Sequence, residues 1–181
     1  LSEVSAATLK RAATVHPIAA VQSEYSLWTR DPEDDGVFAA CRELGTSFVA
    51  YSPLGRGFLT GAFASAGDLQ AGDYRHTSPR FAAANFDANL ALVELVRASA
   101  TRIGATPAQV ALAWVLAQGA VQGVEIIPIP GTKRRRYLDE NVTATRIILP
   151  DTERDALARA FREHEAAGER YPGAVMGLLK G

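Results

Sequence analysis

Four consecutive basic side chains follow a glycine and a threonine in the last third of the sequence. They occupy positions 133–136, directly after Gly131 and Thr132. Cations at a helix N-terminus oppose the helix dipole, so a cluster of them there requires a reason. A bound polyanion would be one, because exposed backbone N–H groups at such a terminus also attract negative charge. From the spacing alone, the turn is either an anion-binding site or a solvated basic turn.

The residues on either side of this turn predict a strand followed by a helix. Residues 125–129 form a short apolar run with β-branched isoleucines, which is typical of a buried strand. Pro128 and Pro130 are expected to end that strand, and Gly131 allows a sharp turn. Helical spacing resumes after the basic side chains.

Other chemical motifs are missing from the sequence or poorly spaced. Residues 55–61 read Gly-Arg-Gly-Phe-Leu-Thr-Gly, whose last glycine lies one residue too far for a dinucleotide fingerprint. Neither a nucleophile elbow nor a phosphate-binding P-loop occurs. The histidines at positions 16, 76 and 164 lie far apart, so no metal site is expected. Trp28 follows the first predicted strand, where it either lines a pocket or packs in the core.

The composition is that of a globular chain without a broad charged surface. The chain has 181 residues, of which 48% are apolar and 22% charged, enough for one domain with a core. Its net charge is −1, so the basic turn is a local feature and nucleic acid is not expected as a partner. The single cysteine, Cys41, excludes an internal disulfide framework and fits a reducing compartment, so we expect a cytoplasmic protein. No apolar run is long enough to cross a membrane and no signal segment opens the chain, so no membrane partner is expected.

Hydrophobic periodicity and cap residues predict helices that alternate with strands. Ser5, the pair Asp31 and Pro32, and Thr106 with Gln109 three residues later are predicted helix starts. A long loop is expected over residues 60–85, either functional or mobile, and residues from 168 onward are expected to form a tail. The predicted helices cover residues 6–15, 32–44, 107–119, a stretch starting at Asn85 or Asp87 and ending at 103, a stretch after 131, and a last helix from 151; the predicted strands cover 18–23, 48–51 and 125–129.

This alternation predicts an α/β fold with a parallel sheet and right-handed crossovers. Ligands in such folds bind at the carboxyl ends of the strands, which is where polar residues follow in this sequence. Three strands are too few for a complete fold of this kind, however. A three-stranded parallel sheet has two open edges, and the predicted helices cannot cover both of its faces and both of its edges. With no initiator methionine before Leu1, we expect the chain to be cut from a longer one.

Five strings, spread over nearly the whole chain, resemble the aldo-keto reductase superfamily. They are VQSEYS (21–26), AYSPLGRGFLTG (50–61), SPRF (78–81), TPAQVALAWVL (106–116) and IPIPGTKRRRYLDENV (127–142), in the family's order. The bacterial and plant NADPH-dependent branches are the most similar. The resemblance implies a (β/α)8 TIM barrel of about twice this length, with NADPH extended across its carboxyl face. Residues 1–181 would be the C-terminal part of that one domain, with strands six to eight and their helices, and the N-terminal part would be absent.

The resemblance assigns the nicotinamide end of the cofactor to the first two predicted strands. Ser2 matches a serine that holds the carboxamide, although Glu3 stands where the family has asparagine. Gln22 matches the glutamine that binds the same carboxamide, and Tyr51 matches the aromatic residue that stacks on the ring. The resemblance further implies a pyrophosphate loop of Ser52, Pro53, Leu54 and Arg56 and another phosphate contact from Arg80. Trp28, from its place after the first predicted strand, is the candidate substrate contact.

The basic turn receives the adenosine end. A 2′-phosphate carries about two negative charges, so the turn predicts a preference for NADPH over NADH. Tyr137 stands where the family often has arginine or glutamine, a departure for which Arg136 or Arg134 could compensate. The implied contacts are Gly131, Thr132 and Lys133 with the 2′-phosphate, and Glu140 with Asn141 at the adenine.

The catalytic residues of the family have no counterpart in this chain. In the family a tyrosine proton donor acts with a lysine, an aspartate and a histidine, all on strands before the position of Leu1. The complete protein is expected to transfer a hydride from NADPH to a small aldehyde or ketone. We expect the 181-residue chain alone to be inactive and to require the N-terminal barrel portion. The alternatives are a noncatalytic NADPH-binding regulatory subunit, and an inactive truncated fragment whose open strand edges aggregate or pair with another chain.

Overall fold

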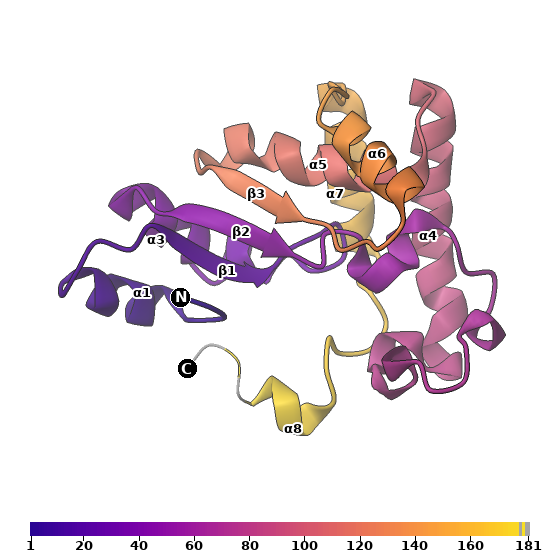
Figure 1. The fold of residues 1–181 in the computed structure, drawn as a ribbon, viewed down its shortest axis with the longest axis horizontal. Coiled ribbons are helices and arrows are strands. Elements are labelled where there is room, and N and C mark those ends of the chain that lie inside the picture. Colours follow the sequence, from indigo (N-terminus) through magenta and orange to yellow (C-terminus); the bar gives the residue numbers. More distant parts are fainter. Residues whose placement is uncertain (178, 180–181) are drawn as a thin grey trace.

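A parallel β-sheet forms the centre of the protein (Figure 1). The structure, a computed structural model, describes residues 1–177 and 179. Across the sheet the strands are, in order, β1 (Ala20–Glu24), β2 (Ser47–Tyr51) and β3 (Ile126–Ile129). The register places Val49 of β2 opposite Gln22 of β1 and Ile127 of β3. The prediction of parallel strands is therefore confirmed, with small differences at the strand ends.

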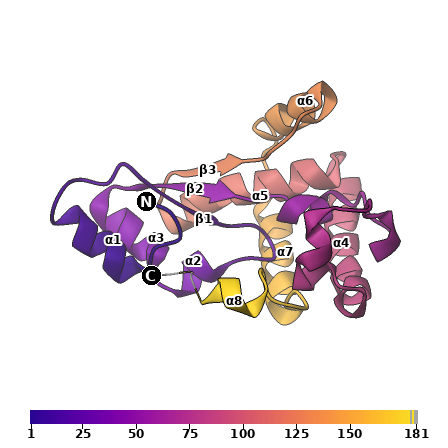
Figure 2. The same ribbon diagram turned by 60° about the horizontal axis from the view of Figure 1, so that its bottom comes forward.

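Helices cover one face of this sheet and leave the other open. Figure 2 shows α1, α3, α5 and α7 on one side, whereas α6 projects away from them. Phe48 and Ala50 on the covered face are fully buried, while Ile127 and Ile129 on the opposite face are each 43% exposed. Parallel sheets are normally buried on both faces, so the described residues cover only half of this one. The helices are α1 (Ala6–Ala13), α2 (Asp31–Asp34), α3 (Val37–Leu44), α4 (Ala83–Ile103), α5 (Pro107–Gln122), α6 (Arg135–Ala144), α7 (Asp151–Glu163) and α8 (Gly173–Met176).

The expectation that Pro128 ends its strand is wrong. Pro128 lies inside β3, opposite Ala50 of β2. In the described chain β3 pairs with β2 only, so it is an edge strand. A proline is tolerated on an edge strand because its missing N–H group costs no ladder bond on the open side.

The single helix predicted over residues 32–44 is also wrong, because the chain breaks into α2 and α3. Gly36 between them has a φ of +85°, in the left-handed region, which interrupts the helical backbone. Helix α3 begins after Gly36, where the Asp35 carboxylate accepts a hydrogen bond from the backbone N–H of Val37 at 3.0 Å.

The structure moves two further helix ends away from their predicted positions. Helix α4 begins at Ala83, ahead of the predicted Asn85 or Asp87 cap, and the Asn85 amide instead donates to the carbonyl of Pro79. Helix α5 continues past Gly119 to Gln122. A Cβ at Gly119 would lie 3.2 Å from the Val124 carbonyl oxygen, so this glycine permits close packing and does not stop the helix.

Two predicted helix starts are confirmed by their hydrogen bonds. The Ser5 hydroxyl accepts from the backbone N–H of Thr8 at the start of α1. At the start of α5, the Thr106 hydroxyl accepts from the N–H of Gln109, whose side chain accepts from the N–H of Thr106. This reciprocal pair is a capping box, and it satisfies two N–H groups that the helix leaves without partners.

The long connection after β2 is compact. It contains the short 3-10 helices η1 (Gly55–Thr60), η2 (Ala66–Asp68), η3 (Tyr74–Thr77) and η4 (Pro79–Phe81). Phe58 and Phe81 are buried within it, with ring centroids 5.2 Å apart. Aromatic packing therefore holds together a segment whose only regular elements are short 3-10 helices.

The predicted tail from residue 168 is likewise not a free end. The Arg80 side chain donates to the Gly168 carbonyl, and Arg170 is 3% exposed. At the other end of the chain, Glu3 donates its N–H to the carbonyl of Gln22 on the outer edge of β1. Within the described residues, no helix combines the length and the apolar character needed to cross a membrane.

Candidate functional site

The carboxyl ends of the three described strands meet at one edge of the sheet. The register aligns Glu24 at the end of β1 with Tyr51 at the end of β2, and Tyr51 with Ile129 at the end of β3. The turn after Tyr51 and the basic turn after Ile129 therefore leave the sheet at the same edge. This edge is where the sequence places its polar residues, as expected for a parallel α/β sheet.

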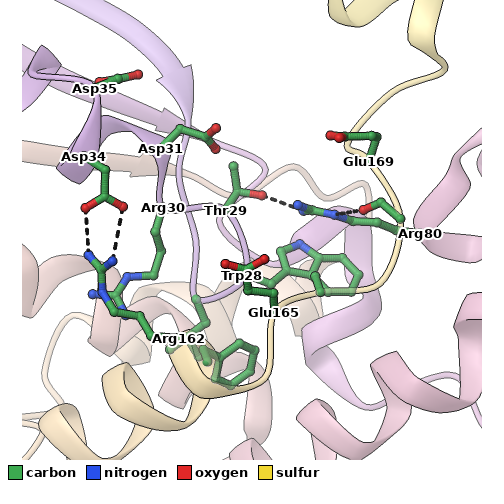
Figure 3. A pocket seen from close by; sticks show the side chains of 14 residues that line it. Trp28, Thr29, Arg30, Asp31, Asp34, Asp35, Arg80, Arg162, Glu165 and Glu169 are labelled. Carbon is green, nitrogen blue, oxygen red and sulfur yellow. Dashed lines mark hydrogen bonds and ion pairs between the residues drawn. The ribbon is translucent and has the colours of Figure 1, made fainter.

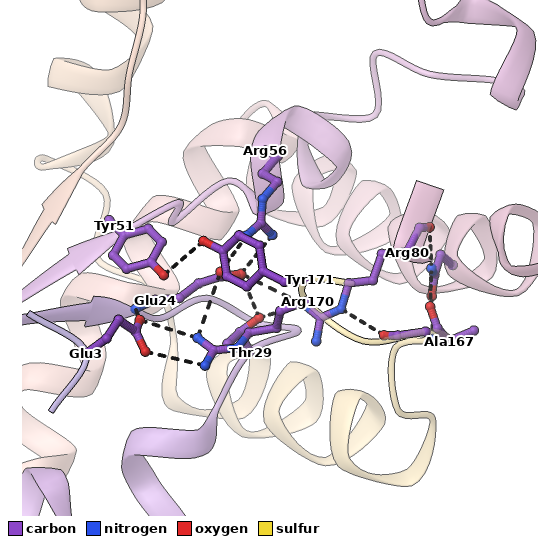
Figure 4. A network of polar contacts seen from close by, with 11 residues as sticks. Glu3, Glu24, Thr29, Tyr51, Arg56, Arg80, Ala167, Arg170 and Tyr171 are labelled. Carbon is purple, nitrogen blue, oxygen red and sulfur yellow. Dashed lines mark hydrogen bonds and ion pairs between the residues drawn. The ribbon is translucent and has the colours of Figure 1, made fainter. Parts of the chain in front are cut away.

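Glu24 is the buried centre of a cluster of guanidinium groups behind this edge (Figure 4). Its two carboxylate oxygens accept hydrogen bonds from Arg56 at 3.1 and 2.8 Å. Arg170 and Arg80 approach the same carboxylate at 3.9 and 4.0 Å. Because Glu24 is fully buried, these cations compensate a charge that could not otherwise leave water.

Arg80 is buried beside Thr29 and Trp28. Its guanidinium donates to the Thr29 hydroxyl at 2.6 Å and lies 5.1 Å from the centre of the Trp28 ring. Burial lowers the pKa of Arg80 to about 10, which still leaves the group protonated at neutral pH. Neither Arg56 nor Arg80 extends freely from the surface, since both guanidinium groups are held by the protein.

The backbone around Arg56 is shaped by its neighbouring glycines. Arg56 has a φ of +56°, and Gly55 and Gly57 also have positive φ values. A Cβ at Gly55 would lie 2.6 Å from the Trp28 ring, so only glycine fits there. The Arg56 carbonyl accepts a hydrogen bond from Arg75 of the long connection at 2.9 Å. These contacts turn the Arg56 side chain inward to Glu24.

Trp28 packs in the core and also lines a cavity, so both roles considered for it from the sequence are compatible. Its ring is 5% exposed and lies 5.0 Å from the Phe58 ring. It also borders a cavity of about 670 Å³ between the segment after β1 and the segment after α7 (Figure 3). Charged side chains dominate the remaining wall, including the ion pair between Asp34 and Arg162 at 3.2 Å.

Tyr51 lies half-buried at the carboxyl edge. Its hydroxyl is 3.1 Å from the hydroxyl of Tyr171. Burial, followed by hydrogen bonds to Tyr171 and Glu3, raises the pKa of Tyr51, so the phenol stays neutral in ordinary buffers. After it, Ser52 has a φ of +49° and Pro53 is buried, which bends the chain away from the sheet.

Ser2 lies beside Gln22 of β1, on the segment that precedes α1. Ser2 forms a parallel bridge with Gln22 at the outer edge of β1. The Gln22 side chain lies on the open face and is exposed. The carboxylate of the neighbouring Glu3 accepts a hydrogen bond from the backbone N–H of Glu24. It also forms an ion pair with Arg170 at 3.4 Å.

The basic turn is solvent-exposed over residues 131–139. Within the described residues, none of the side chains at positions 133–136 forms an ion pair. The Arg136 guanidinium instead donates to the Tyr137 hydroxyl at 2.7 Å and lies over its ring. The Thr132 hydroxyl accepts from the N–H of Arg134 at 3.1 Å, which shapes the approach to α6.

Glu140 and Asn141 lie one and a half turns into α6, where both are half-buried. The Glu140 carboxylate accepts a hydrogen bond from the Thr106 hydroxyl at 2.5 Å. This contact ties α6 to the start of α5. The Glu140 carboxylate therefore has a fixed orientation.

The structure thus groups the predicted residues at one edge but uses them in two ways. Gln22 and the basic turn are exposed and Tyr51 is half-buried, whereas Arg56 and Arg80 are turned inward. Sequence reasoning missed Glu24, Arg170 and Tyr171, because no spacing links side chains that meet only after folding. No group of three metal-ligating side chains occurs among the described residues.

Comparison with protein families finds a match to the Aldo/keto reductase family over residues 1–161. Two curated relatives are similar over nearly the whole chain. Aldo-keto reductase yakc [NADP(+)] from Schizosaccharomyces pombe is 47% identical over 95% of this chain and 50% of its own length. Aldo-keto reductase str7 from Strobilurus tenacellus is 48% identical over 99% of this chain and 52% of its own length. The chain therefore spans about half the length of these curated relatives.

Solved structures give a similar result. The thermostable aldo-keto reductase Tm1743, in complex with the inhibitor epalrestat, is 28% identical with a TM-score of 0.64, over 87% of this chain and 46% of that one. The glycerol dehydrogenase AKR11B4 from Gluconobacter oxydans is 24% identical with a TM-score of 0.79, over 90% and 48%. At that identity the second likeness shows the fold alone.

Proposed function

The chain belongs to the aldo/keto reductase family, and we propose that it is the cofactor-binding, C-terminal part of an NADPH-dependent carbonyl reductase. The observation that carries this proposal is the exposed basic turn at positions 133–136, which has no acidic partner within the described residues. A 2′-phosphate would supply the missing negative charge. The S. pombe relative, whose name specifies NADP(+), supports the choice of cofactor.

Each end of the cofactor has residues of suitable chemistry at the carboxyl edge. Gln22 with Ser2 would hold the carboxamide, and the Tyr51 ring would stack on the nicotinamide. Ser52, Pro53 and Leu54 would carry the backbone under the pyrophosphate. At the adenosine end, Gly131, Thr132 and Lys133 would bind the 2′-phosphate with help from Arg136 and Tyr137, and Glu140 with Asn141 would face the adenine.

Arg56 and Arg80 would act on the cofactor from behind this surface. Both are held by buried partners, Glu24 and Thr29, so they would contribute positive potential under the pyrophosphate more than direct contact. Trp28 would form part of the substrate side through the cavity that it borders. When bound, the reduced nicotinamide supplies a hydride to the carbonyl carbon of an aldehyde or ketone.

The open face of the sheet supports the remaining part of the proposal. Ile127 and Ile129 are exposed there, and a parallel sheet needs cover on that side. Since the chain spans about half of its relatives, the cover would be the other strands of a (β/α)8 barrel. Those strands would also carry the proton donor, and the small carbonyl substrate would bind between the two parts.

Cofactor titration of the complete protein tests this function. Lys133→Ala with Arg136→Ala should weaken NADPH binding about tenfold or more and leave NADH binding nearly unchanged, because charge-assisted hydrogen bonds to the phosphate are lost. Arg146→Ala with Arg159→Ala is the matched control, since it removes the same charge from exposed positions on α6's exit and α7. Equal weakening of both cofactors, or an effect of the control as large as that of the test pair, would refute the assignment.

A further inference from the structure

Tyr171 meets the carboxyl edge from a distant part of the chain. It lies between α7 and α8, 120 residues after Tyr51, yet the hydroxyl oxygens of the two tyrosines are 3.1 Å apart (Figure 4). Tyr51 has no aromatic ring packed against it among the described residues. The contact that bears on its ring is therefore at its far end, where its hydroxyl meets that of Tyr171.

The Tyr171 ring makes a second contact with the same edge. The Arg56 guanidinium lies 4.7 Å from the centre of that ring. On its other side Arg56 forms the two-oxygen pair with the buried Glu24. The ring is thus held by a group that is itself fixed, which suits a cation–π contact that orients Tyr171.

Arg170 anchors this segment next to Tyr171. Its side chain is 4% exposed and lies 3.4 Å from the Glu3 carboxylate and 3.9 Å from that of Glu24. Glu3 and Glu24 belong to the outer edge segment and to β1, so one arginine joins both to the segment after α7. A buried pair of this kind holds its partners together because breaking it would leave an uncompensated buried charge.

We propose that Tyr171 is a positioning residue that holds the Tyr51 ring in the orientation in which it stacks on the nicotinamide. This inference rests on the proposed function, because it requires Tyr51 to be the stacking residue. Arg56 and Arg170 keep Tyr171 in place, and Tyr171 sets the hydroxyl end of Tyr51. A ring held in advance binds a flat ligand with less loss of conformational freedom.

Comparing the binding of two nucleotides, one with and one without a nicotinamide ring, distinguishes this positioning role from a general effect on the structure. Tyr171→Phe in the complete protein keeps the ring on Arg56 and removes only the hydroxyl bond. It should weaken NADPH binding about threefold to tenfold, the usual effect of one neutral hydrogen bond. The binding of 2′-phosphoadenosine diphosphoribose, which has no nicotinamide, should not change. Equal weakening of both ligands, or no weakening of NADPH, would overturn the proposal.

A double-mutant cycle with Tyr51→Phe measures the coupling directly. If the hydroxyl pair orients Tyr51, the second substitution should add little to the loss of NADPH affinity caused by the first. Additive losses would contradict the proposal. Tyr74→Phe, at a tyrosine that is 65% exposed, is the control and should leave both affinities unchanged.

The same titrations distinguish this proposal from the function on which it rests. If the unaltered protein binds neither nucleotide, both proposals are refuted together. If it binds both nucleotides and Tyr171→Phe binds NADPH as tightly as the unaltered protein does, only the positioning role is lost.

Discussion

At the scale of single residues, Glu24 decides what several arginines can do. Sequence similarity assigns Arg56 and Arg80 to phosphate contacts, but in the folded chain both are drawn to this one buried carboxylate. Burying a carboxylate is costly unless cations and hydrogen bonds replace the lost water. Arg56 does so with two hydrogen bonds, which leaves little of its guanidinium for a ligand.

Glu24→Gln should therefore destabilise the protein by about 3–5 kcal/mol, because it leaves buried guanidinium groups without their counter-charge. Lys10→Met is the control: the Lys10–Glu43 pair has side chains that are 48% and 61% exposed, and its loss should cost about 1 kcal/mol or less. Urea denaturation of both variants measures the difference in the free energy of unfolding. Similar costs for the two would show that Glu24 is not the centre of the cluster.

The ionisation of Asp73 makes the stability of the long segment after β2 depend on pH. Hydrogen bonds from the side chain and backbone of Arg75 lower the pKa of Asp73 to about 2. Arg75 in turn donates to the Arg56 carbonyl. Because the folded pKa is depressed, this stabilisation is present above the unfolded value near 4 and is lost as the pH falls toward 2.

The corresponding prediction concerns the rate at which pepsin cleaves the chain within residues 61–82. Asp73→Asn should speed pepsin cleavage of this segment at pH 4, where Asp73 in the unaltered protein is still ionised. The ratio of the two cleavage rates should fall toward one between pH 4 and pH 2, as Asp73 itself becomes protonated. Mass spectrometry of the fragments measures it, and a ratio that does not depend on pH would exclude Asp73 as the acid-sensitive group.

At the scale of elements, close contacts between the backbone at glycines and neighbouring segments determine the path of the chain. The turn at Gly55 presses against Trp28, and helix α5 presses against Val124 at Gly119. The periodicity of apolar residues predicts that a strand or a helix exists, but it does not reveal which glycine ends an element and which one permits contact. For this reason the pattern predicts the strands and the Thr106 capping box correctly, whereas the predicted helix end at residue 119 and the unbroken helix over 32–44 are wrong.

Gly55→Ala tests the packing of the turn on Trp28. Both Gly55 and Gly104 have positive φ values, +57° and +70°, so alanine strains the backbone at either position. Only at Gly55 would the new Cβ collide with a ring, and no atom lies within 4 Å at Gly104. Gly55→Ala should therefore cost about 1–3 kcal/mol more than Gly104→Ala, as overpacking usually does. Equal shifts in the urea midpoint would show that the turn can move away from Trp28.

At the scale of the whole molecule, the described residues cover the sheet on one side only. Helices bury Phe48 and Ala50, while Ile127 and Ile129 remain exposed on the other face. Exposed apolar surface and open strand edges favour association with other chains. The exposed face therefore supports the proposal that further strands of a longer protein cover it.

The chain alone should show no NADPH-dependent carbonyl reduction and should self-associate in analytical ultracentrifugation. A fusion to the half of the S. pombe relative that this chain does not match should self-associate less than the chain alone. It should also reduce a small aldehyde with NADPH. The same fusion with Lys133→Ala and Arg136→Ala should lose activity at low NADPH concentration. Turnover by the unfused chain would contradict the need for a second part.

The sequence by itself determined the local elements, the basic turn and the family resemblance, because each depends on residues that are close together in the chain. The exposure of positions 131–139, which include the apolar Leu138, was decided by the fold. Only the tertiary structure decided that Glu24 captures Arg56 and that Tyr171 reaches Tyr51. The physical reason is that a buried charge or hydroxyl selects its partner by distance in space, and the parallel crossovers and the path after α7 set those distances.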